Sequence, residues 1–298
     1  MGLRVHLVDG TYELFRHHYG LPAAVRAKGS RTAATRGVLG SVLSLLEEGA
    51  THLAVATDHV IESFRNELWP GYKDGSGIDE DLRAQFPVLE EALEAMGVVV
   101  WAMVELEADD ALASGAAVLA EADDVEQVVI CTPDKDLAQC VAGDRVVQLD
   151  RRRNVVLDEA GVVAKYGVGP PSIPDWLALV GDSADGYPGL PGWGAKAAAA
   201  VLRRYGHLEA IPRLGERWDV DVRGCRSLAN TLAAHRDEAL LFRTLATLRV
   251  DRSLVTTAEE LRWSGPRPGF AATSDELRAP GLPARAEQAA TRAEPATD

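Results

Sequence analysis

Short apolar runs that alternate with helical patterns constrain the fold of this chain most. Five runs have the length and β-branched content of buried strands: Leu3–Val8, His52–Thr57, Val98–Val104, Gln127–Thr132 and Val146–Leu149. Four helical patterns lie between the first and the fourth of these runs: Tyr12–Ala27, Thr35–Glu48, Leu82–Met96 and Glu107–Leu119. This alternation predicts an α/β domain with a mainly parallel sheet.

Carboxylates recur where the predicted strands end. Ligands of an open α/β sheet bind outside the carboxyl ends of its strands. A single acid there is usually a helix cap or a turn residue, but acids at four ends of one sheet predict a shared site. Two more acids, three residues apart, lie in a later Gly-Asp-Ser-Ala-Asp-Gly motif. The candidates are Asp9, Asp58, Glu107, Asp109, Asp110, Asp134, Asp136, Asp182 and Asp185.

These nine carboxylates predict a metal site. Hard oxygen ligands without cysteine or histidine indicate Mg²⁺ or Mn²⁺. One octahedral Mg²⁺ keeps several waters and would not use so many acids. Two ions roughly 4 Å apart would use them, and such pairs catalyse in-line phosphodiester hydrolysis.

Composition narrows the function further. The net charge of −14 argues against a generic basic nucleic-acid binder, unless bound cations neutralise the acids. No apolar run is long enough to span a bilayer, and the start of the chain lacks a secretory signal, so no membrane is expected. Three widely spaced cysteines favour a reducing, cytoplasmic location.

A Gly/Pro-rich loop, Pro188–Lys196, precedes a predicted helix. Glycines at a helix start let phosphate oxygens approach backbone N–H groups. The loop therefore favours binding to a nucleic-acid backbone without sequence specificity. The Rossmann and Walker A patterns are absent, and a mere tight turn is an equally good interpretation. Packing of the tryptophan is favoured over base stacking. The candidate DNA-binding residues are Gly189, Gly192, Trp193, Gly194 and Lys196.

The sequence predicts three regions. A catalytic core covers 1–165, and a helical region covers 166–263 with helices at Ser172–Val180, Ala195–Arg204 and Arg226–Leu248. The segment 264–298 is rich in Pro, Ala, Gly, Arg and Glu, and is expected to be largely disordered.

The ordered series of motifs resembles the 5′-nuclease family, which contains the 5′–3′ exonuclease domain of bacterial DNA polymerase I, its stand-alone relatives and the flap endonucleases. The resemblance covers roughly residues 3 to 250. Its motifs are Val8-Asp9-Gly10 with Arg16, Asp58, Phe64-Arg65, Tyr72-Lys73, Glu107-Ala108-Asp109-Asp110, Asp134-Lys135-Asp136, Gly181-Asp182-Ser183-Ala184-Asp185, the Pro188–Lys196 loop and the run His235–Leu241.

This resemblance implies a PIN-like nuclease core and a C-terminal helix-three-turn-helix element that holds duplex DNA. It implies two divalent ions, with Asp109 bridging them and Asp110 acting through water, and a K⁺ ion at the loop before Lys196. It also implies basic catalytic residues, namely Arg16, Arg65 and Lys73. The first ligand set is Asp9, Asp58, Glu107 and Asp109, and the second is Asp134, Asp136, Asp182 and Asp185.

Several positions depart from the family pattern. Pro133 replaces a Gly, Ser76 replaces an Arg, and Gly186 replaces an Asn. The segment Lys73–Asp81, where relatives thread the 5′ single strand, is acidic and contains glycine. These departures concern 5′-end recognition and leave the metal ligands intact.

The sequence therefore predicts a cytoplasmic 5′–3′ exonuclease or 5′-flap endonuclease that acts in DNA replication or repair. Its expected substrates are DNA 5′ ends, flaps and nicks, with RNA primers as a further class, and a separate chain is expected to supply the polymerase. A PIN-type ribonuclease and a catalytically weak DNA-binding scaffold remain as alternatives. A phosphatase is disfavoured because no DxD motif follows the first strand.

Overall fold

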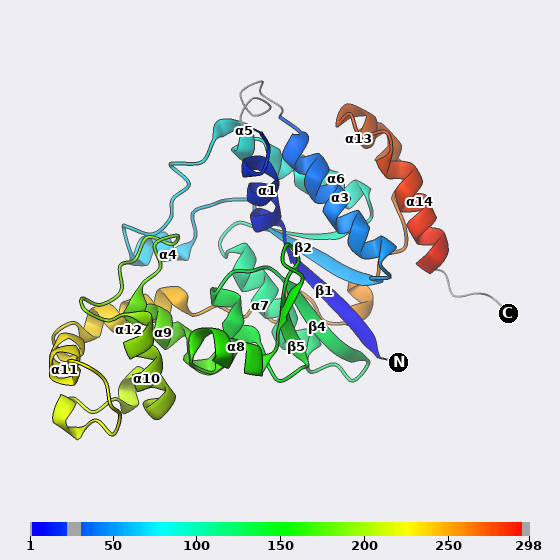
Figure 1. The fold of residues 1–298 in the computed structure, drawn as a ribbon. Coiled ribbons are helices and arrows are strands. Elements are labelled where there is room, and N and C mark those ends of the chain that lie inside the picture. The colour runs from blue at the N-terminus through cyan, green and yellow to red at the C-terminus, as the bar shows by residue number, and fades with distance from the viewer. Residues whose placement is uncertain (1, 23–30, 294–298) are drawn as a thin grey trace. The chain divides into compact units, whose positions relative to one another are not determined.

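The computed structural model describes residues 2–22 and 31–293 (Figure 1). These residues form two compact units. The first lies within Met1–Ile61, Gly75–Thr132 and Val250–Asp298, and the second comprises Glu62–Asp74 and Pro133–Arg249. Neither unit is a contiguous stretch of the chain. The division into units therefore differs from the single boundary near residue 165 that the sequence predicted. None of the described helices has the length and apolarity that a bilayer crossing requires.

The first unit contains four parallel strands. They are β1 (Leu3–Asp9), β2 (His52–Asp58), β3 (Val99–Met103) and β4 (Val125–Cys131), in the order β3-β2-β1-β4. The sheet register pairs Asp9 with Ala56 and Asp58 with Met103, so the strands end at one edge. Every residue of β2 is buried, as expected for a parallel sheet covered on both faces. The predicted α/β class is confirmed.

Helices cover both faces of this sheet. Figure 1 shows α1, α3 and α6 on one side and α7, which contacts all four strands, on the other. The predicted helix Leu82–Met96 is two helices that meet at Ala84. The predicted helix from Tyr12 ends at Tyr19, and part of its expected length lies outside the described residues. The helices are α1 (Gly10–Tyr19), α3 (Ala33–Glu47), α5 (Glu80–Arg83), α6 (Gln85–Ala95), α7 (Ala108–Leu119) and the 3-10 helix η5 (Ala258–Leu261).

The C-terminal segment also folds onto the first unit. Expected disorder is wrong for most of it, because Phe270–Glu276 forms α13 and Leu282–Ala293 forms α14. Alanine is the strongest helix former, and three buried positions of α14 recur at helical spacing: Leu282, Ala286 and Ala289. The helix packs against α3, where Arg285 pairs with Glu47 at 2.7 Å. The compositional bias concealed an amphipathic helix.

The second unit combines an antiparallel hairpin with helices. Its bounds are α4 (Phe64–Leu68), η1 (Asp136–Cys140), β5 (Val146–Asp150), β6 (Val155–Leu157), α8 (Glu159–Tyr166), η2 (Pro170–Ser172), α9 (Ile173–Val180), α10 (Ala195–Tyr205), η3 (Leu208–Ala210), η4 (Gly215–Arg217), α11 (Cys225–Ala234) and α12 (Arg236–Ala246). The single helix predicted over Arg226–Leu248 is wrong, because the backbone leaves the helical conformation at His235. The break separates α11 from α12, which packs its buried Phe242 and Leu245 in a core shared with α9.

Candidate metal centre

Two predicted ligands of the first unit are held by helix-capping bonds. Asp9 begins α1, where its carboxylate accepts hydrogen bonds from the Tyr12 N–H and the Thr132 hydroxyl, both at 2.8 Å. Asp58 accepts a bond from the Ala108 N–H at 2.7 Å, at the start of α7. Both side chains are nearly buried. The strand ends therefore place these carboxylates at the edge predicted from the sequence.

The acidic motif at the start of α7 is partly structural. Asp110 is fully buried, and its carboxylate accepts a hydrogen bond from the Glu107 N–H at 3.0 Å. Glu107 is also buried, whereas Asp109 is half-buried. A carboxylate is favoured at this position by the partial positive charge of the helix start. Metal ligation by these three residues remains a prediction.

In the second unit, three predicted ligands form one cluster. Asp136, Asp182 and Asp185 each offer a carboxylate oxygen, and these oxygens lie within 4.8 Å of one another. Burial, together with the charges of Asp185, Asp134 and Asp182, raises the pKa of Asp136 well above its ordinary value. Such crowding of like charges disfavours ionisation unless a cation is present. The arrangement suits a divalent ion with oxygen ligands.

The Asp-Lys-Asp turn places a fourth acid near the cluster. The exposed Asp134 accepts a bond from the Asp136 N–H at 3.2 Å, which ties the two residues into a local turn. Its backbone carbonyl accepts a hydrogen bond from Gln148. Pro133 precedes this turn and belongs to the same unit.

Two lysines pair with the clustered acids. Lys73 lies 3.3 Å from Asp185, and Lys135 lies 2.6 Å from Asp182. Burial lowers the pKa of Lys135, but the hydrogen bond and charge of Asp182 outweigh it and raise the pKa overall. Sequence reasoning missed Lys135 as a site residue, although it is the central residue of the quoted Asp-Lys-Asp motif. The two ammonium groups compensate part of the cluster's negative charge.

The glycine at position 186 has a physical explanation. Its φ of +82° lies in the left-handed region, and a Cβ there would meet the Gly71 carbonyl oxygen at 2.0 Å. The indole N–H of Trp69 donates to the Gly186 carbonyl at 3.1 Å. The Lys73 N–H donates to the Asp185 carbonyl at 3.1 Å. The close contact between Gly71 and Gly186 and this hydrogen bond fix the Lys73 backbone beside Asp185.

Arg65 does not have the environment predicted for a catalytic residue. Its side chain is 1% exposed and donates hydrogen bonds to the carbonyls of Leu245 at 2.8 Å and Thr247 at 3.3 Å. These carbonyls end α12, where cations are favoured by the helix dipole. Arg65 is therefore buried against backbone carbonyls of its own unit, and its predicted role near the scissile phosphate remains a prediction.

Arg16 is held by a buried acid within the first unit. It donates to Glu13 at 2.5 Å and to the Ser41 hydroxyl at 3.3 Å. Burial acts to raise the pKa of Glu13, but hydrogen bonds from His17, Arg16 and Ser41 prevail and lower it to about 2. Glu13 thus orients Arg16, and the predicted catalytic role of Arg16 remains a prediction.

This arrangement predicts a pH-dependent stability effect for Glu13→Gln. Because the pKa of Glu13 is depressed, its ionised carboxylate stabilises the folded state above pH 4.5. This stabilisation is lost as pH falls towards 2 and the carboxylate becomes protonated. We expect the variant to lose up to about 3 kcal/mol of unfolding free energy at pH 7. Urea denaturation from pH 7 to pH 2 should show the two proteins converging at low pH. A constant difference, or one shared by the exposed-site control Glu91→Gln, would contradict the assignment.

The Gly/Pro loop leads into an uncapped helix. Gly189 and Gly192 have φ values of +69° and +80°, and Gly194 precedes α10 without a side-chain cap. Lys196 is exposed and forms no ion pair among the described residues. Trp193 is only 6% exposed and packs near Trp218, with ring centroids 6.0 Å apart. The tryptophan therefore packs in the core, the interpretation favoured from the sequence, and its place among the DNA-binding residues remains a prediction.

The chain thus combines an α/β unit with a largely helical unit that carries an acidic cluster suited to a divalent ion. The chain belongs to the 5′-3′ exonuclease family. A model of its N-terminal resolvase-like domain matches residues 4–167, and a model of its C-terminal SAM fold matches residues 168–269. The family predicted from the motif series is confirmed.

Relatives and solved structures agree with this assignment. The chain is 34% identical over 218 residues to a 5′-3′ exonuclease of Aquifex aeolicus, covering 72% of this chain and 74% of the relative. It is 36% identical over 265 residues to DNA polymerase I of Pseudomonas aeruginosa, covering 86% of this chain. The chain spans 28% of that polymerase's length. A bacteriophage T5 flap endonuclease, solved with DNA and metal ions, shares the fold with a TM-score of 0.65 at 17% identity, covering 98% of this chain and 100% of that one.

Proposed function

We propose that this chain is a divalent-metal-dependent 5′-nuclease that hydrolyses DNA phosphodiesters. The observation that carries the proposal is the cluster of Asp136, Asp182 and Asp185, whose carboxylate oxygens lie within 4.8 Å. A buried group of like charges is costly without a cation, and its oxygen ligands favour Mg²⁺ or Mn²⁺. Family membership supports phosphodiester hydrolysis as the reaction.

Each unit supplies one proposed ligand set. Asp9, Asp58, Glu107 and Asp109 form the set of the first unit, with Asp110 acting through water. Asp134, Asp136, Asp182 and Asp185 form the set of the second unit. Bound divalent ions supply an activated water nucleophile and stabilise the charge that develops on the phosphate.

Basic side chains complete the proposed chemistry. Lys73 is partly exposed beside Asp185, so its ammonium group can contact a phosphate oxygen of the substrate. Lys135 balances Asp182 and keeps that carboxylate ionised and oriented. Arg16, held by Glu13, supplies a further positive charge from the first unit.

The proposed substrates are DNA molecules with 5′ ends, flaps or nicks, with RNA primers as a further class. The relatives that carry this region include DNA polymerases, so replication and repair are the proposed processes. The helix start at Gly194 offers free N–H groups to a DNA phosphate, and K⁺ is proposed at the same loop. The three cysteines, which form no disulfide in the described part of the chain, fit the proposed cytoplasmic location.

A gel assay with end-labelled substrates tests the function. The substrates are a 5′-flap, a nicked duplex, single-stranded DNA and single-stranded RNA, each with Mg²⁺, Mn²⁺ or EDTA. We expect metal-dependent cutting near the flap junction that is absent in Asp134→Ala. Cutting of RNA alone would favour the PIN-type ribonuclease. Duplex binding without cutting would favour the scaffold and direct attention to Ser76 and Lys73–Asp81.

Lys196→Ala is expected to weaken DNA binding about fivefold while leaving the cleavage rate at saturating DNA within twofold. The reason is the loss of one phosphate contact, which should also reduce the slope of log affinity against log salt by about one. Fluorescence anisotropy with a labelled flap measures the affinity from 50 to 200 mM salt. The exposed Arg267→Ala serves as the control for general charge loss. Unchanged affinity of the Lys196 variant would refute this role.

A further inference from the structure

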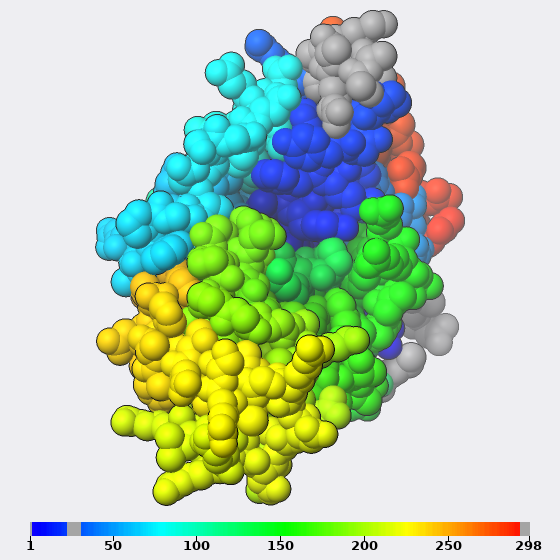
Figure 2. All heavy atoms as spheres, turned by 60° about the vertical axis from the view of Figure 1, so that its left-hand side comes forward, coloured from blue at the N-terminus to red at the C-terminus, as the bar shows by residue number. Residues whose placement is uncertain are grey.

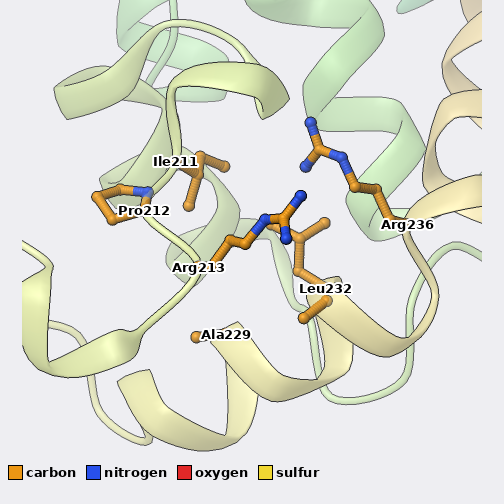
Figure 3. A pocket seen from close by; sticks show the side chains of 7 residues that line it. Ile211, Pro212, Arg213, Ala229, Leu232 and Arg236 are labelled. Atoms are coloured by element: carbon orange, nitrogen blue, oxygen red, sulfur yellow. The ribbon is translucent and has the colours of Figure 1, made fainter.

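A small pocket lies between the start of α12, the end of α11 and the segment after η3 (Figure 3). Its volume is about 140 Å³, and it lies wholly within the second unit. Figure 2 shows the surrounding segment, coloured yellow-green to yellow, as a continuous surface. None of the predicted metal-binding or DNA-binding residues lines the pocket. It is therefore separate from the candidate metal centre.

Two arginines line the pocket. Arg213 comes from the loop after η3 and Arg236 is the first residue of α12. Figure 3 shows their guanidinium groups pointing toward one another. Neither forms an ion pair or side-chain hydrogen bond with another described residue. The charge of Arg236 also acts on Glu209, whose hydrogen-bond partner is Arg243. Two facing guanidinium groups without a hydrogen-bonded counter-ion favour an anionic ligand, because each can hold a carboxylate in a bidentate pair.

Most acids near the pocket in sequence pair with residues outside it. Residues 203–238 contain seven arginines and six carboxylates, and two of these acids, Asp219 and Glu216, pair with Arg204 and Arg226. The acids Glu209 and Glu238 are paired elsewhere, with Arg243 at 2.6 Å and His235 at 3.2 Å. The pocket is thus a local site of positive charge on an acidic protein, to which an acidic ligand would be directed.

The remaining lining is apolar and rigid. Ile211, Ala229 and Leu232 are buried residues of the helical core, and their side chains line the pocket. The Trp218 indole N–H donates to the Pro212 carbonyl at 2.8 Å, which fixes the loop beside the pocket. A cavity of roughly 150 Å³ holds a benzene ring. The space therefore suits one phenylalanine or leucine side chain.

We propose that this pocket binds an acidic peptide segment of a partner protein. One apolar side chain of the peptide enters the cavity, and neighbouring carboxylates pair with Arg213 and Arg236. A nucleic-acid backbone would use the two guanidinium groups but would leave the apolar part of the pocket, beside Ile211 and Leu232, unfilled. An acidic peptide with an apolar side chain would pair with the two arginines and also fill the apolar part of the pocket. Buried apolar anchors flanked by charged pairs are the usual centres of such interfaces.

The test uses fluorescein-labelled peptides and the full chain. The first peptide contains three aspartates followed by leucine and phenylalanine. In the second, two alanines replace the apolar residues, and in the third, lysines replace the aspartates. We expect the first peptide to bind, and each replacement to weaken binding at least tenfold in fluorescence anisotropy. Failure of the first peptide to bind below 1 mM, a concentration that corresponds to about 4 kcal/mol of binding free energy, would overturn the proposal.

Variants locate the binding and exclude DNA as the ligand. Arg213→Ala and Arg236→Ala should each weaken peptide binding about fivefold or more, and Ala233→Glu at the exposed rim should do the same. Arg223→Ala, an exposed arginine outside the pocket, should have no effect. All these side chains except the half-buried Arg236 are exposed, and circular dichroism checks the fold of each variant. Peptide binding that is unaffected by the variants, or an equal loss of affinity for single-stranded or duplex DNA, would overturn the proposal.

Discussion

Asp136→Asn is expected to reduce flap cleavage by at least about 1000-fold, which corresponds to roughly 4 kcal/mol of transition-state stabilisation. The residue is nearly buried, and it contributes one of the three carboxylate oxygens that lie within 4.8 Å. The amide has similar size, so packing is retained while the negative charge is lost. An amide oxygen is a weaker ligand for a hard divalent cation than an ionised carboxylate.

Stability measurements separate this loss of activity from misfolding. The raised pKa of Asp136 means that the metal-free fold is more stable with this carboxyl protonated. The stability that protonation provides is lost as pH rises through the pKa of Asp136 in the folded state. In EDTA at pH 8, the variant should therefore have a melting temperature equal to or above that of the wild type. Added Mg²⁺ or Mn²⁺ should raise the melting temperature of the wild type more than that of the variant.

The matched control is Asp221→Asn, an exposed acid in the same unit. It should retain both the cleavage rate and the metal-induced rise in melting temperature. If Asp136→Asn cleaved at a rate within tenfold of the wild type, Asp136 would not be an essential ligand. If its metal-free form unfolded at a lower temperature, the argument from its raised pKa would be wrong.

Arg65→Ala is expected to destabilise the protein by about 3 kcal/mol or more. The substitution removes a fully buried guanidinium and leaves the carbonyls of Leu245 and Thr247 without these donors. Each buried polar group left unpaired costs about 1–3 kcal/mol. A cavity adds to the loss because the side chain is among the largest that are fully buried.

Urea denaturation combined with kinetics distinguishes a structural from a catalytic role. The unfolding midpoint of Arg65→Ala should fall, while the cleavage rate per folded molecule should stay within about fivefold of the wild type. Arg65→Lys should recover only part of the stability, because lysine lacks the planar fork that donates to two carbonyls at once. Normal stability with a cleavage rate lowered 100-fold would restore the catalytic role that the Phe64-Arg65 motif suggested.

The local pattern of residues predicted the architecture of the first unit well. Its strands are short, apolar and rich in valine, so the expected β1, β2 and β4 differ from the observed ones by at most two residues at either end. Helix ends were predicted less well, because a continuous helical pattern does not show where the backbone turns. The break at His235 depends on the packing of α11 and α12, which periodicity alone does not reveal.

The C-terminal helices show how composition can mislead. Alanine and arginine in 264–298 suggested a low-complexity tail, yet Arg285 pairs with Glu47 and the apolar face of α14 packs against α3. Those partners are more than 230 residues away in the chain. No local property of the segment identifies them, so only the folded structure provides the surface that stabilises the helix.

The sequence by itself determined the family, the parallel α/β class and the group of acids, because each depends on residue order and local spacing. Only the tertiary structure decided the environments of the basic residues. Arg65, Lys73 and Lys135 all carry a positive charge, but the first is buried against helix carbonyls and the other two pair with clustered acids. What a charged side chain does depends on its burial and on the groups around it, and distant parts of the chain supply both.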